Sequence, residues 1–352
     1  MKKFSFYATL IFLMTFMLTA CETESGKKDS STGKVSIVTT IYPQYDWIKN
    51  ILGEYSDKVD LKLLIKNGTD LHSYKTSAQD IAAIAKADMV VYVGGESDDW
   101  IKKALEATPK AGRIQVNLMD VLGDRVKEEE IVEGMQVEEE TKDERRKTKE
   151  NAEEHHEHAE EHEHEHHEHA EAPENDEHIW LSLKNAQILV KSLAESVAKI
   201  DTANAPVYRA NAILYASKLH DLDWAYDSTV SYASQKTVLF GDRFPFRYLV
   251  DDYGIKYYAA FVGCSAESEA SFETVAFLAG MMDSLSLPVI FTIDGSHTKV
   301  ARAILNASKN SKNAPVLELN SMQSVTDEQI QSGIDYLSIM KSNLITLKKG
   351  LK

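Results

Sequence analysis

Residues 77–105 read SAQDIAAIAKADMVVYVGGESDDWIKKAL, and this stretch decides the fold. Ser77, followed three residues later by Asp80, suggests the capped start of a helix. Residues 89–93 then form a short apolar run that ends at two glycines, which predicts a buried strand. A second helical pattern follows the glycines. Units of strand and helix repeated in this way indicate a parallel sheet with helices on both faces.

The same alternation begins at residue 35 and returns after residue 235, where KTVLFGD, IKYYAAFV, PVIFTID and PVLELN are strand-like and FPFRYLVDDYG is helix-like. Between these regions, residues 183–234 contain almost no Gly or Pro and have apolar residues at helical spacing, which predicts long helices. Pro206 fits the first turn of the second of them. The sequence therefore predicts an α/β protein of two lobes, each a parallel sheet flanked by helices, joined by a long helix. The expected parts are a first lobe at 34–126, its remainder with the linking helices at 178–234, and a second lobe at 235–352.

One acidic segment carries the whole net charge of −16. Residues 127–177 hold 22 of the 55 acidic residues and 6 of the 39 Lys and Arg residues, so the rest of the chain is neutral. A neutral body argues against a general nucleic-acid-binding protein, which needs a basic face. The segment lacks aromatic residues and is of low complexity, and we expect it to be a disordered insertion.

The same segment holds eight of the twelve histidines, interleaved with glutamates. Imidazoles at this density can capture divalent metals weakly in many overlapping arrangements, whereas acidity alone would need only glutamate. We therefore expect a low-affinity metal-binding loop. Its histidines are His155, His156, His158, His162, His164, His166, His167 and His169.

The N-terminus has the form of a bacterial export signal. Two lysines precede an apolar run that ends in LTAC, a pattern that resembles a lipobox. The alternative is a transmembrane anchor, but the run is short for a bilayer core of about 30 Å. We expect residues 1–20 to be a signal peptide, Cys21 to be lipidated, and residues 21–33 to be a tether that holds the protein outside the bacterial cell membrane. Cys264 would then lack a disulfide partner and is expected to be a buried, inert thiol.

Four histidines lie outside the acidic segment. His72 and His297 follow predicted strands, where ligands of α/β proteins gather, and His178 precedes a predicted helix. Imidazole suits zinc and other borderline metals, but each of these residues could equally be a hydrogen-bonded loop histidine. His220 lies within a long predicted helix and is expected to have a surface or core role.

The sequence lacks the local motifs of common enzymes. It has no GxxxxGK[ST], no GxGxxG after a strand, no GxSxG and no HExxH. An ATPase or a dinucleotide-dependent dehydrogenase is therefore not indicated, and we expect a protein that is not an enzyme.

The motifs LTAC, IYPQYDW, NGTDLHSY, ADMVVYVGG with DDW, HIWLSLKNA and RYLVDDYG, together with the His-rich insertion, occur in one order along the chain. This set resembles the solute-binding lipoproteins of bacterial zinc and manganese ABC transporters, the cluster A-I or cluster 9 family. The resemblance covers essentially all of the chain after Cys21. It implies two α/β lobes with one metal ion between them, delivered by a monomeric lipoprotein to a membrane permease and its ATPase.

The resemblance also implies ligands. His72 matches the first histidine ligand of the family and His178 the second. The third lies shortly before the tyrosine that corresponds to Tyr248, and counting back without gaps leads to Arg243, which cannot ligate. One inserted residue would bring Asp242 to the position, and Asp242 is the predicted third ligand.

The fourth position of the family, often an aspartate, falls in LNSMQSVT, where this chain has Asn320. Glu269 and His297 remain in reserve as ligands. A His-rich loop between the first two ligand motifs is typical of the zinc branch, and nitrogen-rich ligation suits zinc. Zn²⁺ is therefore the expected cargo, with Mn²⁺ as the alternative.

Two other functions stay open. A centre of two histidines and one carboxylate with an open position also occurs in zinc hydrolases, although no local motif here supplies a general base. Alternatively, the protein could be a surface adhesin or metal buffer in which the His-rich segment is the functional element.

Overall fold

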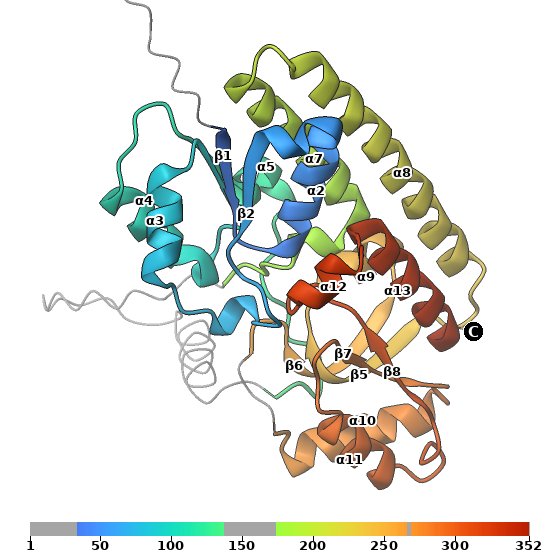
Figure 1. The fold of residues 1–352 in the computed structure, drawn as a ribbon. Helices are drawn as coiled ribbons and strands as arrows, with labels where there is room; N and C mark the ends of the chain where they lie inside the picture. The colour runs from blue at the N-terminus through green and yellow to red at the C-terminus, as the bar shows by residue number, and fades with distance from the viewer. Residues whose placement is uncertain (1–33, 137–173, 266–268, 352) are drawn as a thin grey trace, which may run out of the picture. The chain divides into compact units, whose positions relative to one another are not determined.

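The computed structural model describes residues 34–136, 174–265 and 269–351 (Figure 1). The described residues contain two four-stranded sheets, and all strand pairings within them are parallel. The strand orders are β2-β1-β3-β4 and β6-β5-β7-β8. The predicted α/β class with two parallel sheets is confirmed. The strands are β1 Val35–Thr39, β2 Val59–Leu63, β3 Met89–Tyr92, β4 Ile114–Asn117, β5 Thr237–Phe244, β6 Lys256–Val262, β7 Ile290–Ile293 and β8 Val316–Leu319.

Helices connect and cover these strands, because parallel strands need long crossover connections. The α-helices are α2 Tyr42–Leu52, α3 Ala78–Lys86, α4 Asp99–Ala107, α5 Leu118–Leu122, α7 Leu183–Ile200, α8 Ala205–Ser231, α9 Arg247–Tyr253, α10 Phe272–Ser284, α11 Lys299–Ala307, α12 Asp327–Gln331 and α13 Tyr336–Gly350. Short 3₁₀ turns are η1 Gly53–Lys58, η2 Leu71–Ser73, η3 Glu96–Asp98, η4 Gly123–Arg125 and η5 Ile179–Leu181.

The first sheet is covered on both faces. All four residues of β3 are buried, as expected of an interior strand of a parallel sheet. On one face Ile84 of α3 and Ile101 of α4 pack with Val90, and on the other α2, α5 and α7 contribute to a larger core. The predicted capping box is present, since the Ser77 side chain accepts from Asp80 N and the Asp80 side chain accepts from Ser77 N.

The second sheet is built in the same way. On one face α10 and α11 form a core with it that includes Leu239, Leu278 and Ile304. The other face joins the larger core, which contains Ile37 of the first sheet together with Phe240 of the second. The two lobes therefore share a continuous apolar core.

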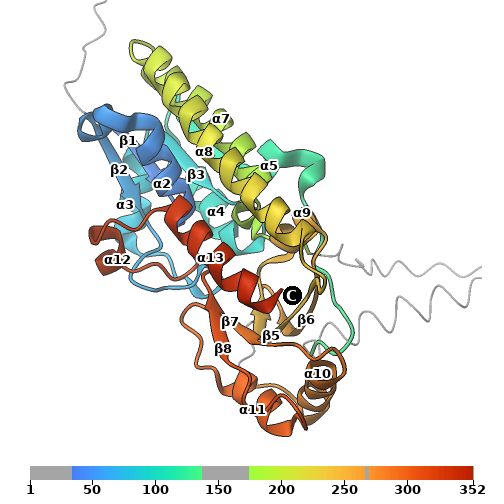
Figure 2. The same cartoon turned by 90° about the vertical axis from the view of Figure 1, so that its right-hand side faces the viewer.

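Helix α8 links the lobes. It has 27 residues and is therefore about 40 Å long. It packs along α7 and against α2 of the first lobe, and against α9 and α13 of the second (Figure 2). Pro206 lies in its first turn, as predicted.

Strand β5 is longer than the sequence pattern suggested. We expected a strand over residues 236–242 and a helix from 244, but β5 continues to Phe244 and α9 begins at Arg247. The pairing of β5 with β6 shifts register between Phe240 and Arg243. At Gly241 the strand passes so close to α11 that an added Cβ would lie 2.5 Å from the Ala301 Cα. This irregularity sets the positions of the residues that follow Gly241.

The ends of the acidic segment are structured, so the predicted disorder over residues 127–177 does not hold for them. Glu128 and Asn175 form an antiparallel bridge, and Asp176 N donates to Lys127 O at 2.8 Å. Lys127 N donates to the Tyr248 hydroxyl at 2.9 Å, which links the paired ends of the acidic segment to α9. The expected disorder there fails because these contacts come from residues far away in the sequence.

The central part of that segment, with its eight histidines, lies outside the described residues, as do the expected signal peptide and the whole expected tether with Cys21. Within the ranges that the structure describes, none of the helices combines the length and the apolar composition that a membrane span requires.

Candidate metal site

His72 is positioned by a short capped turn after β2. The chain leaves the strand, turns through Gly68 at positive φ and enters η2, whose N-cap is Asp70. The Asp70 carboxylate accepts from His72 N at 2.9 Å. The His72 imidazole then meets the Ser97 hydroxyl through Nδ1 at 2.8 Å, which fixes the ring with Nε2 directed away from Ser97.

His178 follows the C-terminal end of the acidic segment and is the N-cap residue of η5, where it is fully buried. Asp176 holds it twice: its Oδ1 accepts from His178 N at 2.8 Å and lies 2.9 Å from Nδ1. A carboxylate at Nδ1 keeps the proton there and leaves the Nε2 lone pair free for a metal.

The two imidazoles meet at their Nε2 atoms, which are 3.2 Å apart. Burial, and next the neighbouring His178, lower the pKa of His72 to about 3. The His72 imidazole is therefore neutral at neutral pH, the form in which it can ligate a metal. Residues far apart in the chain thus supply two convergent nitrogen donors.

Cys264 completes the one group of three potential ligand side chains found among the described residues. Its Sγ and one nitrogen of each imidazole all lie within 4.8 Å of one another. Cys264 is half-buried and comes two residues after β6 ends. Burial raises the pKa of its thiol well above the ordinary value, with the Glu129 carboxylate as the next cause.

A buried amide side chain, that of Gln323, contacts His178 in this group. The side chain is 5% exposed, and its Nε2 lies 3.0 Å from His178 Nε2. Its Oε1 is buried and has no hydrogen-bond partner. A buried amide oxygen without a partner is costly, so it marks a place where a ligand could supply the missing interaction.

Carboxylates surround the histidines. Glu177 accepts from Ser97 N at 2.8 Å through Oε1, and its Oε2 lies 3.7 Å from His72 Nδ1. Burial raises the pKa of both Glu177 and Glu129, although each accepts a backbone hydrogen bond. The surroundings therefore favour a cation.

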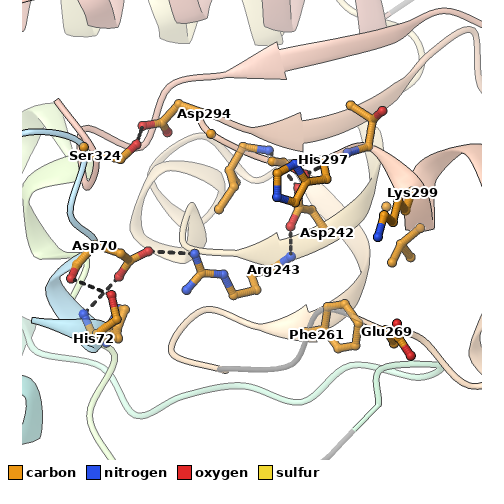
Figure 3. Close-up of a pocket in the computed structure, with 18 residues that line it drawn as sticks. Asp70, His72, Asp242, Arg243, Phe261, Glu269, Asp294, His297, Lys299 and Ser324 are labelled. Atoms are coloured by element: carbon orange, nitrogen blue, oxygen red, sulfur yellow. Dashed lines mark hydrogen bonds and ion pairs between the residues drawn. The ribbon is translucent and has the colours of Figure 1, made fainter. Parts of the chain in front are cut away.

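The other predicted ligands lie in the wall of an adjoining cavity of about 420 Å³, which His72 also lines. Asp242 accepts there from Ile293 N at 3.2 Å and from Arg243 N at 2.9 Å. Glu269 and His297 line the same cavity (Figure 3). None of these three belongs to the group of close donors described above.

Arg243 lines the same cavity and lies between Asp70 with His72 on one side and Asp242 on the other (Figure 3). Its guanidinium pairs with Asp70 at 2.7 Å and donates to Ser265 O at 3.4 Å. Although burial acts to raise it, the pKa of Asp70 is held below its usual value by this guanidinium. The cation therefore joins the β5 end of the second lobe to the turn that carries His72.

Asn320, at the family's fourth ligand position, and His220, for which no ligand role was expected, also lie outside the group. Asn320 uses its carboxamide oxygen to accept from Met322 N at 2.8 Å, so it caps its own loop. His220 is exposed on α8. Sequence reasoning did not place Gln323, Asp176 or Cys264 beside the two histidines. One available signal was that Cys264 comes two residues after a predicted strand, near the strand ends where ligands gather.

Two parallel-sheet lobes joined by a long helix, with converging histidines and an adjoining polar cavity, define a two-lobed solute-binding architecture. The chain belongs to the family of the periplasmic zinc-uptake complex component A (ZnuA), whose model matches residues 37–350.

Named relatives agree with this family. The high-affinity zinc uptake system protein ZnuA of Bacillus subtilis is 31% identical over 337 residues, which is 95% of this chain and 94% of that protein. The zinc-binding lipoprotein AdcA of Streptococcus pneumoniae is 30% identical over 99% of this chain, but the chain spans only 61% of that relative's length. The solved Zn(II)-bound ZnuA-like domain of S. pneumoniae AdcA has 27% identity and a TM-score of 0.64, covering 90% of this chain and 99% of that one.

The close approach of Gly263 to His178 gives a test of the site geometry. A Cβ at Gly263 would lie 2.9 Å from His178 Cε1 and 3.0 Å from Phe244 O, so Gly263→Ala must displace the buried ring or the strand. We expect zinc affinity to fall roughly 10-fold, as when a ligand loses its orientation. Competition titration with a chelator measures it. Gly280→Ala, which meets no atom within 4 Å, is the matched control, and equal affinities in the two variants would contradict the placement of His178.

Proposed function

We propose that this protein is the extracytoplasmic solute-binding lipoprotein of a zinc ABC transporter. It captures one Zn²⁺ between its lobes and delivers the ion to a membrane permease driven by an ATPase. The observation that carries the proposal is the pair of Nε2 atoms of His72 and His178, 3.2 Å apart in a buried, carboxylate-lined site. The names of the relatives, a zinc uptake protein and a zinc-binding lipoprotein, support the same cargo.

The donor set favours zinc over manganese. Manganese prefers carboxylate, carbonyl and water oxygens, whereas imidazole nitrogen suits zinc. One Nε2 of the pair accepts hydrogen bonds from its neighbours, and zinc would take over that lone pair. A proton on the other Nε2 would shift to Nδ1 of the same ring, so the two neutral imidazoles would ligate without releasing a proton. Asp176 and Ser97, which contact the two Nδ1 atoms, hold the rings in place for this exchange.

The proposed layout follows from the sequence. It comprises a signal peptide at 1–20, a tether lipidated at Cys21 over 21–33, a first lobe at 34–126, an acidic His-rich loop at 127–177, linking helices at 178–234 and a second lobe at 235–352. The histidines of the loop would collect zinc weakly near the cell surface. We assign the protein capture and delivery, as a monomer, and no catalytic role.

The lipid anchor has its own test. Cells that express the protein should incorporate radiolabelled palmitate into it, and Cys21→Ala should abolish the labelling and release the protein from the membrane fraction. Palmitate incorporation that persists in Cys21→Ala would remove the assignment of Cys21.

Zinc titration in competition with a chelator tests the cargo and the site. The full chain, purified in detergent, is compared with His72→Ala, with His220→Ala as the control for an exposed histidine, and with a variant carrying Gln at all eight loop histidines. We expect one tight zinc ion in the full chain, in His220→Ala and in the loop variant. His72→Ala should weaken it by about 1,000-fold, equivalent to roughly 4 kcal/mol.

The outcomes separate the alternative functions. Loss of tight binding in the loop variant, with His72→Ala unaffected, would identify a surface metal buffer instead of a transporter component. Tight manganese binding with weak zinc binding would reverse the choice of cargo.

A further inference from the structure

Zinc capture between two lobes needs a donor from each lobe, and the histidines come from one side only. His72 follows β2 of the first sheet, and His178 precedes the helices that cover that sheet. From the second lobe, counting back from Tyr248 without gaps leads to Arg243 at the position of the family's third ligand. A guanidinium has no lone pair to offer and is always charged, so it cannot ligate.

Asp242 is also engaged elsewhere. Both of its carboxylate oxygens accept backbone hydrogen bonds, from Arg243 N and Ile293 N. Among the described His, Cys, Asp and Glu residues of the second lobe, the one whose side chain groups with both imidazoles is Cys264, within 4.8 Å. The chain reaches it through Gly263, whose missing side chain lets the backbone pass close to His178.

We infer that Cys264 is the third protein ligand, so that the ion is held by two imidazole nitrogens and a thiolate. This inference rests on the proposed function. Two independent observations support it: the Cys264 sulfur lies with the two nitrogens, and the buried Gln323 Oε1 beside His178 lacks a partner. Rotation of the Gln323 amide by half a turn would exchange its nitrogen and oxygen and offer the oxygen as a fourth donor.

Binding through Cys264 displaces the thiol proton, since the thiolate is the ligand. The products are a zinc–sulfur bond and a proton that leaves to the solvent. The Glu129 carboxylate, which accepts from Cys264 N at 3.1 Å, holds the loop that presents the sulfur.

A thiolate ligand determines which metal ions the site prefers. Two nitrogens and one sulfur suit zinc and softer ions such as Cd²⁺, and they disfavour Mn²⁺, which prefers oxygen ligands. Because the sulfur comes from the second lobe, the bound ion would also join the two lobes. Cys264 is thus the residue that makes this site selective against manganese.

Cobalt substitution tests the sulfur ligand directly. Every sample is the full chain with Cys21→Ser, so that Cys264 is the single thiol of a chain with two cysteines. Co²⁺ should produce a near-ultraviolet thiolate-to-cobalt charge-transfer band, which neither the loop histidines nor His72 can supply. Cys264→Ser should abolish the band and weaken zinc binding at least about 100-fold, beyond the usual effect of a residue that only orients a ligand.

Asp242→Asn is the matched control and should keep both the band and the zinc affinity. Cys264→Asp should narrow the ratio of zinc to manganese affinity, because it replaces the soft donor with an oxygen. Thermal unfolding of metal-free Cys264→Ser should match that of its parent, which separates ligand loss from misfolding.

The results distinguish two failures. Tight zinc binding that persists in Cys264→Ser, with no charge-transfer band in its parent, overturns the thiolate ligand and leaves the proposed function standing. Absence of a tight zinc site in the parent overturns the proposed function itself. Loss of tight binding in Asp242→Asn, with Cys264→Ser unaffected, assigns the third ligand to Asp242.

Discussion

His178→Ala is expected to abolish high-affinity zinc binding, with a loss of at least about 1,000-fold, or roughly 4 kcal/mol. The imidazole is fully buried, and its Nε2 faces the His72 Nε2 at 3.2 Å. Without it, the His72 imidazole would be the one nitrogen donor left in the group of close donors that the described residues form. Competition titration of the full chain with a zinc chelator measures the loss.

Asp176→Asn is the variant to compare with His178→Ala. Asparagine keeps an oxygen that can accept from His178 Nδ1 but removes the charge, so it tests orientation without removing a ligand. We expect it to weaken zinc binding by roughly 10- to 100-fold, less than His178→Ala. If His178→Ala retained one zinc ion within tenfold of the original affinity, His178 would not be a ligand.

The order of elements could be predicted because local chemistry determines it. The apolar run of β3, the capping box at Ser77 and Pro206 at the start of α8 each act within a few residues. Buried strands alternating with capped helices leave a parallel sheet as the natural arrangement. The two lobes and the long helix between them were therefore accessible from the sequence.

Counting back from Tyr248 could not identify the side chain that lies with the two histidines, because counting assumes a regular strand. The register of β5 against β6 shifts between Phe240 and Arg243, where Gly241 passes against Ala301. The positions of Asp242 and Arg243, which follow Gly241, therefore depend on contacts with α11, far along the chain. Cys264 lies beside the histidines, and its position shortly after a predicted strand was the available sequence signal, since no local ligand motif includes it.

The composition of the acidic segment also gave the wrong expectation for two residues of the site. The acidic segment as a whole has too few apolar residues to fold alone, and that reasoning included Asp176 and Glu177. These two residues are nevertheless buried, and they contact His178 and Ser97 respectively. Their order comes from Tyr248, whose hydroxyl donates to Asp176 O at 2.8 Å and accepts from Lys127 N at 2.9 Å. An average over the segment cannot detect such a tertiary contact.

Trp180→Ala is expected to cost about 3–5 kcal/mol of folding free energy, the range for removing a large buried aromatic side chain. The Trp180 side chain is 1% exposed, and its ring centroid lies 5.3 Å from that of His178. Its Nε1 donates to Ser321 O at 2.8 Å, and its carbonyl accepts from the Tyr336 hydroxyl at 2.6 Å. The indole thus joins the turn after His178 to the loop after β8, while its backbone is tied to α13, so its loss opens a cavity beside the site.

Guanidinium unfolding of the zinc-free protein measures this cost. Trp180→Phe is the matched control: it keeps most of the apolar volume and removes the N–H, which leaves Ser321 O unpaired at a cost of about 1–3 kcal/mol. Saturating zinc should restore part of the stability of both variants, because an ion that binds only the folded state stabilises it. A loss below about 1 kcal/mol in Trp180→Ala would show that the indole does not hold the loop after β8 against the turn that carries His178, and Gln323 would then need another support to stay beside the histidines.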